Sequence, residues 1–155
     1  MYVFDNSPLS TLFRNYYRNR FPSLWNNFRD VVNQDGLVST REAFREIMDG
    51  QITELREWAE NNQGLFATPT AAEGAVVARI YAVPHFQQNL EQQKLLKGGR
   101  NADAFVIARA SVENRTVVTM EKFKANAAKI PNICRHLGVR CMTLEEFMEA
   151  EKWQF

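Results

Sequence analysis

Four acidic residues lie beside the ends of apolar segments, where α/β proteins usually place the side chains that do chemistry. Asp5 directly follows the first apolar triplet of the chain, and Glu46 lies within two helical turns of a second apolar segment. Asp103 and Glu121 flank a third apolar region. Several carboxylates in one cleft repel each other unless a cation neutralises them. The spacing therefore predicts a site for Mg²⁺ or Mn²⁺, hard ions that prefer carboxylate and water oxygens.

A metal site of this kind points to phosphodiester hydrolysis. A bound ion lowers the pKa of a water molecule and stabilises the leaving oxygen. The sequence contains no Ser-His-Asp or Cys-His arrangement and no Walker-type phosphate loop, which disfavours covalent catalysis. Each acid also has a structural explanation: Asp103 suits the first turn of a helix, and Glu46 suits a solvated helix face. The combination of the four carries the prediction.

Apolar periodicity and turn residues predict strands alternating with helices. Predicted strands cover residues 2–4, 37–39, 116–119 and 139–141, and predicted helices include 7–19, 22–34, 39–49, 52–62 and 102–113. This order indicates an α/β protein, a single three-layer α/β/α domain over residues 1–155 with a central parallel sheet. The carboxyl ends of parallel strands share one edge, so we expect the four acids to converge there.

Two details of the predicted helices matter for the site. Ser39 and Glu42 match a capping box, as do Thr143 and Glu146. The capping box accounts for Glu42, which otherwise rivals Glu46 as a ligand. The amide-rich run 87–93 predicts a solvated helix.

Composition excludes several classes of protein. The 155 residues carry a formal net charge of +1, so no strong global field attracts nucleic acid or membranes. We see no secretory or transit leader and no apolar run of membrane-spanning length, and we expect a cytoplasmic protein without membrane contact. Cys134 and Cys141 are expected to be reduced thiols. With His136 they fall short of the four ligands of a structural zinc site.

Four segments together resemble the PIN-domain superfamily of metal-dependent nucleases, and most closely its PIN-like toxins of bacterial type II toxin-antitoxin pairs. The matching segments are Val3-Phe4-Asp5-Asn6-Ser7, residues 38–47 with Glu46 before Ile47, residues 102–108 with Asp103, and Val117-Val118-Thr119-Met120-Glu121. No single segment is specific. Their order and spacing hold across almost the whole chain.

The resemblance implies a PIN-like fold whose acidic pocket holds Mg²⁺ or Mn²⁺ on Asp5, Glu46 and Asp103. Ser7 and Thr119 would support the pocket through their hydroxyls. Many members carry aspartate where this chain has Glu121, so the longer side chain would bind through water or act on a second metal. The activity implied is that of an endoribonuclease toxin, with RNA as substrate, a DNA-binding antitoxin as partner and a homodimer as a possible state.

RNA also needs phosphate contacts, and basic residues flank the last two acidic segments: Lys94, Lys97, Arg100, Arg109, Lys122 and Lys124. We take Lys97, Arg100, Lys122 and Lys124 as the candidate substrate contacts. One alternative is a PIN-like module that binds RNA or protein and has lost its metal. Another is a phosphoryl-transfer protein of the haloacid-dehalogenase or receiver type, but Ser7 replaces the second aspartate that the phosphatases need.

Overall fold

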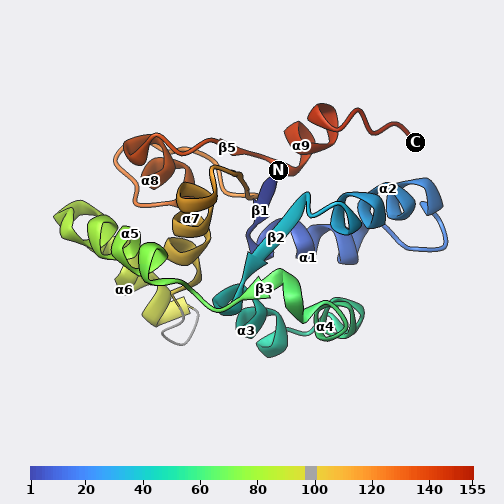
Figure 1. Ribbon diagram of the computed structural model, residues 1–155, viewed down its shortest axis with the longest axis horizontal. Helices are drawn as coiled ribbons and strands as arrows, with labels where there is room; N and C mark the ends of the chain where they lie inside the picture. Colours follow the sequence, from blue (N-terminus) through green and yellow to red (C-terminus); the bar gives the residue numbers. More distant parts are fainter. Residues whose placement is uncertain (97–100) are drawn as a thin grey trace.

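The central feature of the fold is a five-stranded parallel sheet (Figure 1). The computed structural model describes residues 1–96 and 101–155, with side chains placed except at 94–96. The strands are β1 (Tyr2–Phe4), β2 (Leu37–Thr40), β3 (Phe66–Ala67), β4 (Thr116–Val118) and β5 (Cys141–Met142). Their order across the sheet is β3-β2-β1-β4-β5, and all pairs are parallel. The predicted parallel sheet is confirmed.

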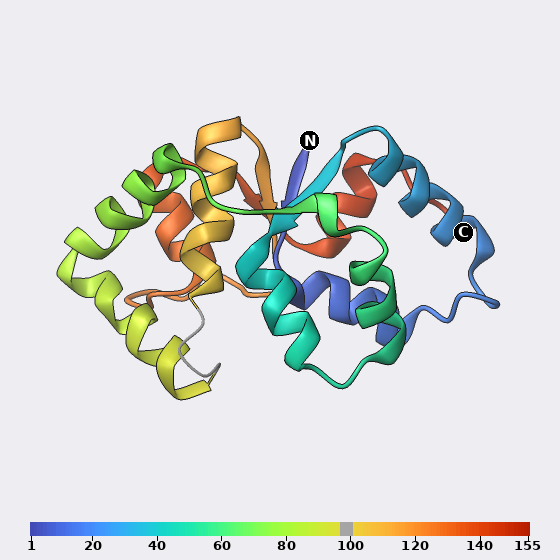
Figure 2. The same cartoon turned by 60° about the horizontal axis from the view of Figure 1, so that its bottom comes forward.

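Helices cover both faces of this sheet. Their bounds are α1 (Asn6–Asn15), α2 (Pro22–Asn33), α3 (Arg41–Asp49), α4 (Thr53–Glu60), α5 (Ala71–Ala82), α6 (Gln87–Leu96), α7 (Ala102–Glu113), α8 (Ile130–Leu137) and α9 (Leu144–Ala150), with short 3₁₀ turns η1 (Gln63–Leu65) and η2 (Pro84–Phe86). Two views place α1, α2, α4 and α9 on one side and α5, α6, α7 and α8 on the other (Figure 1, Figure 2). This confirms the three-layer α/β/α architecture. In the described part of the chain, no helix has the length and apolar character needed to cross a membrane.

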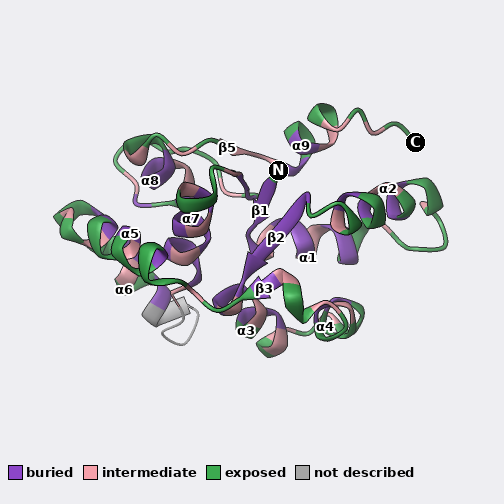
Figure 3. Cartoon of the chain, in the orientation of Figure 1, coloured by how far each residue is buried: buried purple, intermediate pink, exposed green. Residues whose placement is uncertain are grey.

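The strands β1, β2 and β4 supply side chains to two hydrophobic cores, because successive side chains of a strand point to opposite faces. Tyr2 and Phe4 belong to the core under α1, α2, α4 and α9, while Val3 between them belongs to the core under α5, α7 and α8. Val3 is paired with Val38 on one side and Val117 on the other. The short central strands are buried throughout (Figure 3). Because these strands pair in parallel, their carboxyl ends lie at the same edge of the sheet.

The structure corrects two predicted boundaries near the site. The first helix ends at Asn15, four residues earlier than expected, and the indole N–H of Trp25 donates to the carbonyl oxygen of Tyr16 at 2.8 Å. The predicted capping box of Ser39 and Glu42 is wrong, since Thr40 is the N-cap and its Oγ1 accepts from the backbone N–H of Ala43 at 3.2 Å. The Ser39 hydroxyl instead donates across the sheet to a backbone carbonyl of β1.

The sequence prediction also missed or shifted two edge strands. β3 contains only Phe66 and Ala67, too few residues for a pattern, and pairing with Ser39 and Thr40 of β2 defines it. β5 is Cys141–Met142 instead of 139–141, because its register is set by Val117 and Val118 of β4. By contrast, the capping box that opens α9 at Thr143 is confirmed. Of the two predicted capping boxes, the structure confirms the one at α9 and corrects the one at α3.

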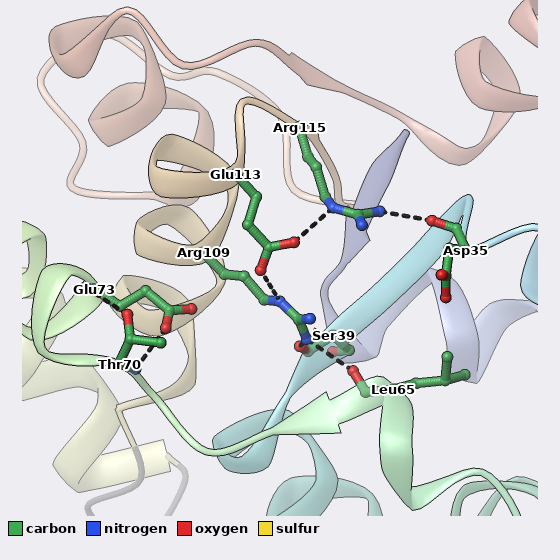
Figure 4. A network of polar contacts seen from close by, with 8 residues as sticks. All are labelled: Asp35, Ser39, Leu65, Thr70, Glu73, Arg109, Glu113 and Arg115. Atoms are coloured by element: carbon green, nitrogen blue, oxygen red, sulfur yellow. Dashed lines mark hydrogen bonds and ion pairs between the residues drawn. The ribbon is translucent and has the colours of Figure 1, made fainter.

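Arg109 of α7 ties the helix layer to the sheet (Figure 4). Its Nη1 donates to the carbonyl oxygens of Ser39 and Leu65, and its Nε lies 2.6 Å from a carboxylate oxygen of Glu113. Arg115 binds the other oxygen of Glu113 at 2.9 Å. Although sequence placed Arg109 among possible phosphate contacts, these bonds commit its guanidinium to holding the end of β2.

The ion pairs of Glu113 with Arg109 and Arg115 make the stability of the fold depend on pH. Burial alone would raise the pKa of Glu113, but Arg109 and Arg115 outweigh it and hold that pKa below its ordinary value of 4.5. A depressed carboxyl pKa stabilises the fold at neutral pH, and this contribution disappears as the pH falls through the folded-state pKa. We expect Glu113→Gln to lower the free energy of unfolding at neutral pH by at most about 1 kcal/mol, because the cluster is partly solvated.

Urea unfolding of wild type and Glu113→Gln at about pH 7 and about pH 3 measures this effect. The difference between the two proteins should shrink at the acid pH. Glu149→Gln, an exposed position on α9, is the matched control and should show little difference at either pH. A difference for Glu113→Gln that grows in acid would contradict the prediction.

Candidate active site

Asp5 lies at the carboxyl end of the central strand β1, at the N-cap position of α1. Its backbone N–H donates to the carbonyl oxygen of Val118 at 3.0 Å, which fixes it beside the end of β4. The side chain is 3% exposed. Its Oδ2 accepts hydrogen bonds from the hydroxyls of Ser7 at 2.9 Å and Thr119 at 3.1 Å. Its Oδ1 is buried and receives no hydrogen bond from the described residues.

The two hydroxyls are themselves held in place. The backbone N–H of Met120 donates to Ser7 Oγ at 3.0 Å, and that of Glu121 donates to Thr119 Oγ1 at 3.2 Å. Thr119 is fully buried. The segment after β4 therefore orients the hydroxyls that orient Asp5, and this carboxylate points in one direction without using its capping capacity.

Asp103, in the first turn of α7, is held by two side-chain amides. Its Oδ2 accepts from Asn89 Nδ2 at 2.9 Å and from Gln93 Nε2 at 3.2 Å. Asn89 also donates to the carbonyl oxygen of Ala128 at 3.1 Å, while its Oδ1 accepts from the hydroxyl of Tyr81 at 3.0 Å. Burial, then the charge of Asp103, raises the pKa of Tyr81, so this hydroxyl remains a donor at neutral pH.

The prediction that the amide-rich run is a solvated helix is therefore wrong for one of its faces. Asn89 is 1% exposed and Gln93 is 5% exposed. A usable signal was present in the sequence. Phe86, Asn89 and Gln93 follow each other at intervals of three and four residues, which places both amides on the helical side that continues from a buried aromatic ring. Buried amides on a helix need acceptors, and a buried carboxylate is the strongest one nearby.

Glu46 projects from α3, a helix that packs against both α1 and α7. It is only 9% exposed, so the solvated-surface explanation for this residue is wrong. Its rival Glu42 is also buried, at 6%, and is paired with the guanidinium of Arg41 at 2.8 Å. Because Thr40 provides the cap, a capping box no longer accounts for Glu42. α3 thus contributes two buried carboxylates, Glu42 and Glu46.

Glu121 is directed to the start of α8. Its Oε2 accepts from the backbone N–H of Ile130, the first residue of that helix, at 2.9 Å. A carboxylate in this place satisfies a backbone donor and interacts favourably with the helix dipole. This contact gives position 121 a structural use that an aspartate, with its shorter side chain, would reach less easily.

We expect Glu121→Ala to lower the free energy of unfolding by about 1 kcal/mol, since it removes an acceptor at a helix start. Glu121→Gln retains a carbonyl oxygen at the same reach and should remain close to wild type. Thermal or urea unfolding measures both. Glu145→Ala, an exposed position in the first turn of α9, is the matched control. Equal stability of Glu121→Ala and wild type would show that the contact contributes nothing.

The charges of four acids act on the thiols of Cys134 in α8 and Cys141 in β5. The pKa of Cys134 is raised by its hydrogen bond with Cys141, by burial and then by the charges of Glu121 and Asp103. For Cys141 the hydrogen bond with Cys134 lowers the pKa, while burial and the charges of Glu146, Glu121 and Asp5 oppose this shift. Topology places Asp5, Asp103 and Glu121 on the carboxyl side of the sheet, because Asp5 follows β1, Glu121 follows β4, and Asp103 begins the helix α7 that leads to the start of β4.

The described residues contain no group of three His, Cys, Asp or Glu side chains that could hold a metal ion as they stand. Neither the four candidate acids nor the two cysteines with His136 form such a group. His136 lies with its ring edge-on to Phe86, at 5.2 Å between centroids. The structure places Asp5, Asp103 and Glu121 on the carboxyl side of the sheet and buries Glu46 on α3.

The candidate basic contacts divide into two groups. Lys122 and Lys124 are exposed in the segment that follows Glu121. Lys97 and Arg100 lie outside the described residues. Basic side chains thus accompany the acids on the side of β4.

Comparison with known proteins adds a family. The family described as Domain of unknown function (DUF4411) matches residues 2–155. No curated protein matches the chain. Because the match spans nearly every residue, the chain belongs to the DUF4411 family.

Proposed function

We propose that this protein is a Mg²⁺- or Mn²⁺-dependent endoribonuclease of the PIN-like kind and the toxin of a type II toxin-antitoxin pair. One observation carries the proposal: the buried carboxylate of Asp5 at the end of the central strand. Two hydroxyls hold its Oδ2, and its Oδ1 is buried without a hydrogen bond from the described residues. A buried carboxylate oxygen without a donor is costly, and a cation would remove that cost.

The donor set fits a hard divalent ion in its chemistry. Asp5, Glu46 and Asp103 supply carboxylate oxygens from β1, α3 and α7, and all three are buried. These residues would hold the ion, and Glu121 would act from the start of α8. The bound ion would supply a water of lowered pKa for attack on phosphorus.

The remaining polar residues would orient these ligands. Ser7 and Thr119 hold one oxygen of Asp5, which leaves the other oxygen to face a ligand. Asn89 and Gln93 likewise hold Oδ2 of Asp103. Residues that orient metal ligands in this way typically contribute 10- to 100-fold, by order of magnitude, to metal affinity or activity.

RNA would reach the site along the exposed segment after β4, where Lys122 and Lys124 could contact phosphates. A net charge of +1 offers little long-range steering, so these local contacts would carry most of the electrostatic attraction. Binding should therefore weaken with salt by an amount that reflects only a few neutralised phosphates.

The test is cleavage of a single-stranded RNA by the purified full chain with Mg²⁺, with Mn²⁺ and with EDTA. We expect cleavage only with a divalent ion, and its loss in Asp103→Asn prepared in the same way. Full cleavage by Asp103→Asn would identify a contaminating nuclease or another site. Mn²⁺ binding without any cleavage would favour the alternative, a PIN-like module that only binds RNA or protein.

The toxin role has a separate test. A small DNA-binding protein encoded by the neighbouring gene, and able to suppress cleavage when co-purified, would support the pair. A nuclease with no such neighbour would retain the enzymatic part of the proposal and lose the regulatory part. Sedimentation of the purified chain would show whether it forms a homodimer.

A further inference from the structure

A cavity of about 780 Å³ opens directly beside the candidate active site. Its wall includes the segment after β4, the first turns of α8 and α9, and β5. The residues that matter below are Met120, Glu121, Lys122, Phe123, Arg135 and Glu145. Glu121 is shared with the candidate active site, and Met120 donates its N–H to the Ser7 hydroxyl that holds Asp5. An occupant of the cavity would therefore lie next to the acids.

The cavity has an unusual apolar lining for a surface so close to charged groups. Phe123 is 50% exposed and Met120 is 40% exposed, although most large apolar side chains of the chain are buried. The guanidinium of Arg135 lies over the Phe123 ring, 4.9 Å from its centroid. An exposed aromatic ring backed by an arginine is a stacking surface for a flat ligand, and every nucleobase has such a flat face.

The charges around the cavity favour entry of the base of a nucleotide over entry of its phosphate. Lys122 lines it and Lys124 follows on the same segment, where they could contact a phosphodiester backbone. Glu145 and Glu146 line the other side. A phosphate would be repelled there, whereas a neutral base would not. The backbone would then follow the lysine side and the base would point into the cavity.

From this arrangement we propose that the cavity is a nucleobase subsite for single-stranded RNA, with Phe123 as the stacking platform. The inference rests on the proposed ribonuclease function and adds to it a contact that binds one base of the substrate. Stacking needs an unpaired base, so duplex RNA could not use this subsite. The subsite would place one nucleotide beside the site while the neighbouring phosphate meets the acids.

The experiment measures binding of a short fluorescent single-stranded RNA by polarisation, in Asp5→Asn protein so that the probe stays intact. Adding Phe123→Ala should weaken binding about tenfold, the typical loss of one base–aromatic stack. Phe123→Trp should restore it, since the larger ring stacks at least as well. Phe155→Ala, at another exposed phenylalanine that does not line the cavity, is the matched control and should change nothing.

A second probe separates stacking from general damage. With an oligonucleotide that has abasic sugars in place of bases, Phe123→Ala and its parent should bind equally, because only the backbone contacts remain. Unchanged binding of ordinary RNA by Phe123→Ala would overturn the subsite and would leave the cavity for a peptide of a partner protein. Metal-dependent cleavage by wild type in the same series would show that the proposed function survives that outcome, and failure of wild type to bind or cleave RNA would overturn both.

Discussion

Replacing Asp5 with asparagine is expected to abolish metal-dependent cleavage and divalent-ion binding while the fold survives. Asparagine has nearly the same shape, and the hydroxyls of Ser7 and Thr119 can still donate to its side-chain oxygen. The loss of function should exceed the roughly 100-fold that removal of an orienting residue can cost, because a ligand itself is lost. RNA cleavage and Mn²⁺ titration measure the two effects.

Stability gives an independent test of the same substitution. Without metal, the wild-type protein keeps a buried carboxylate oxygen that receives no hydrogen bond from the described residues. Asp5→Asn should therefore leave the metal-free free energy of unfolding unchanged or raise it. Wild type should gain thermal stability as Mn²⁺ is added, since the folded state alone binds the ion, and Asp5→Asn should not.

Asp30→Asn is the matched control for these measurements. It makes the same chemical change at an exposed position of α2, remote from the sheet edge. It should keep cleavage, Mn²⁺ binding and stabilisation by Mn²⁺. If Asp5→Asn instead lost several kcal/mol of stability without metal, Asp5 would be a structural residue and the proposed centre would lose its main support.

The second large effect is expected at Asn89. Asn89→Leu keeps the side-chain volume but removes the donor to the Ala128 carbonyl, one of two amide donors to Asp103 and one of two acceptors of the Tyr81 hydroxyl. Each buried polar group that loses its partner costs about 1 to 3 kcal/mol. We expect the free energy of unfolding to fall by about 3 kcal/mol and Mn²⁺ affinity to fall at least about tenfold.

Urea unfolding and Mn²⁺ titration under folding conditions separate these two losses. Gln88→Leu, one residue away on the exposed face of α6, should change neither. Asn89→Asp adds a further comparison, because it keeps the shape and replaces the donor to Asp103 with a second carboxylate that repels it. Loss of stability with unaltered Mn²⁺ affinity in both Asn89 variants would show that Asn89 supports the fold and does not position Asp103.

Much of the fold could be predicted from local sequence because it depends on local forces. The apolar triplet at β1, the proline at the start of α2 and the Thr143 cap of α9 each carry a signal that needs no distant partner. The order of strands and helices then requires a layered parallel sheet. The edge strand β3 gave no such signal, because two residues form a strand only through their pairing with β2.

The candidate site divides in the same way. Asp5, Glu46 and Asp103 could be selected from sequence because each follows or precedes an apolar segment, and the structure shows all three buried. Their partners could not all be selected. Asn89 appeared to be one amide among several in a polar run, and Glu42 appeared to be a cap. Both assignments depended on burial, which only the packing of α6 and α3 decides.

Local sequence was enough to predict a layered parallel sheet with Asp5 at the end of a buried strand, because the apolar triplet and the alternation of strands and helices need no distant partner. The contacts of each acid come only from the packing of distant segments. The tertiary structure attached the hydroxyls of Ser7 and Thr119 to Asp5, the amides of Asn89 and Gln93 to Asp103, and the start of α8 to Glu121. These are contacts between distant segments, and their strength depends on burial and direction that no local pattern contains.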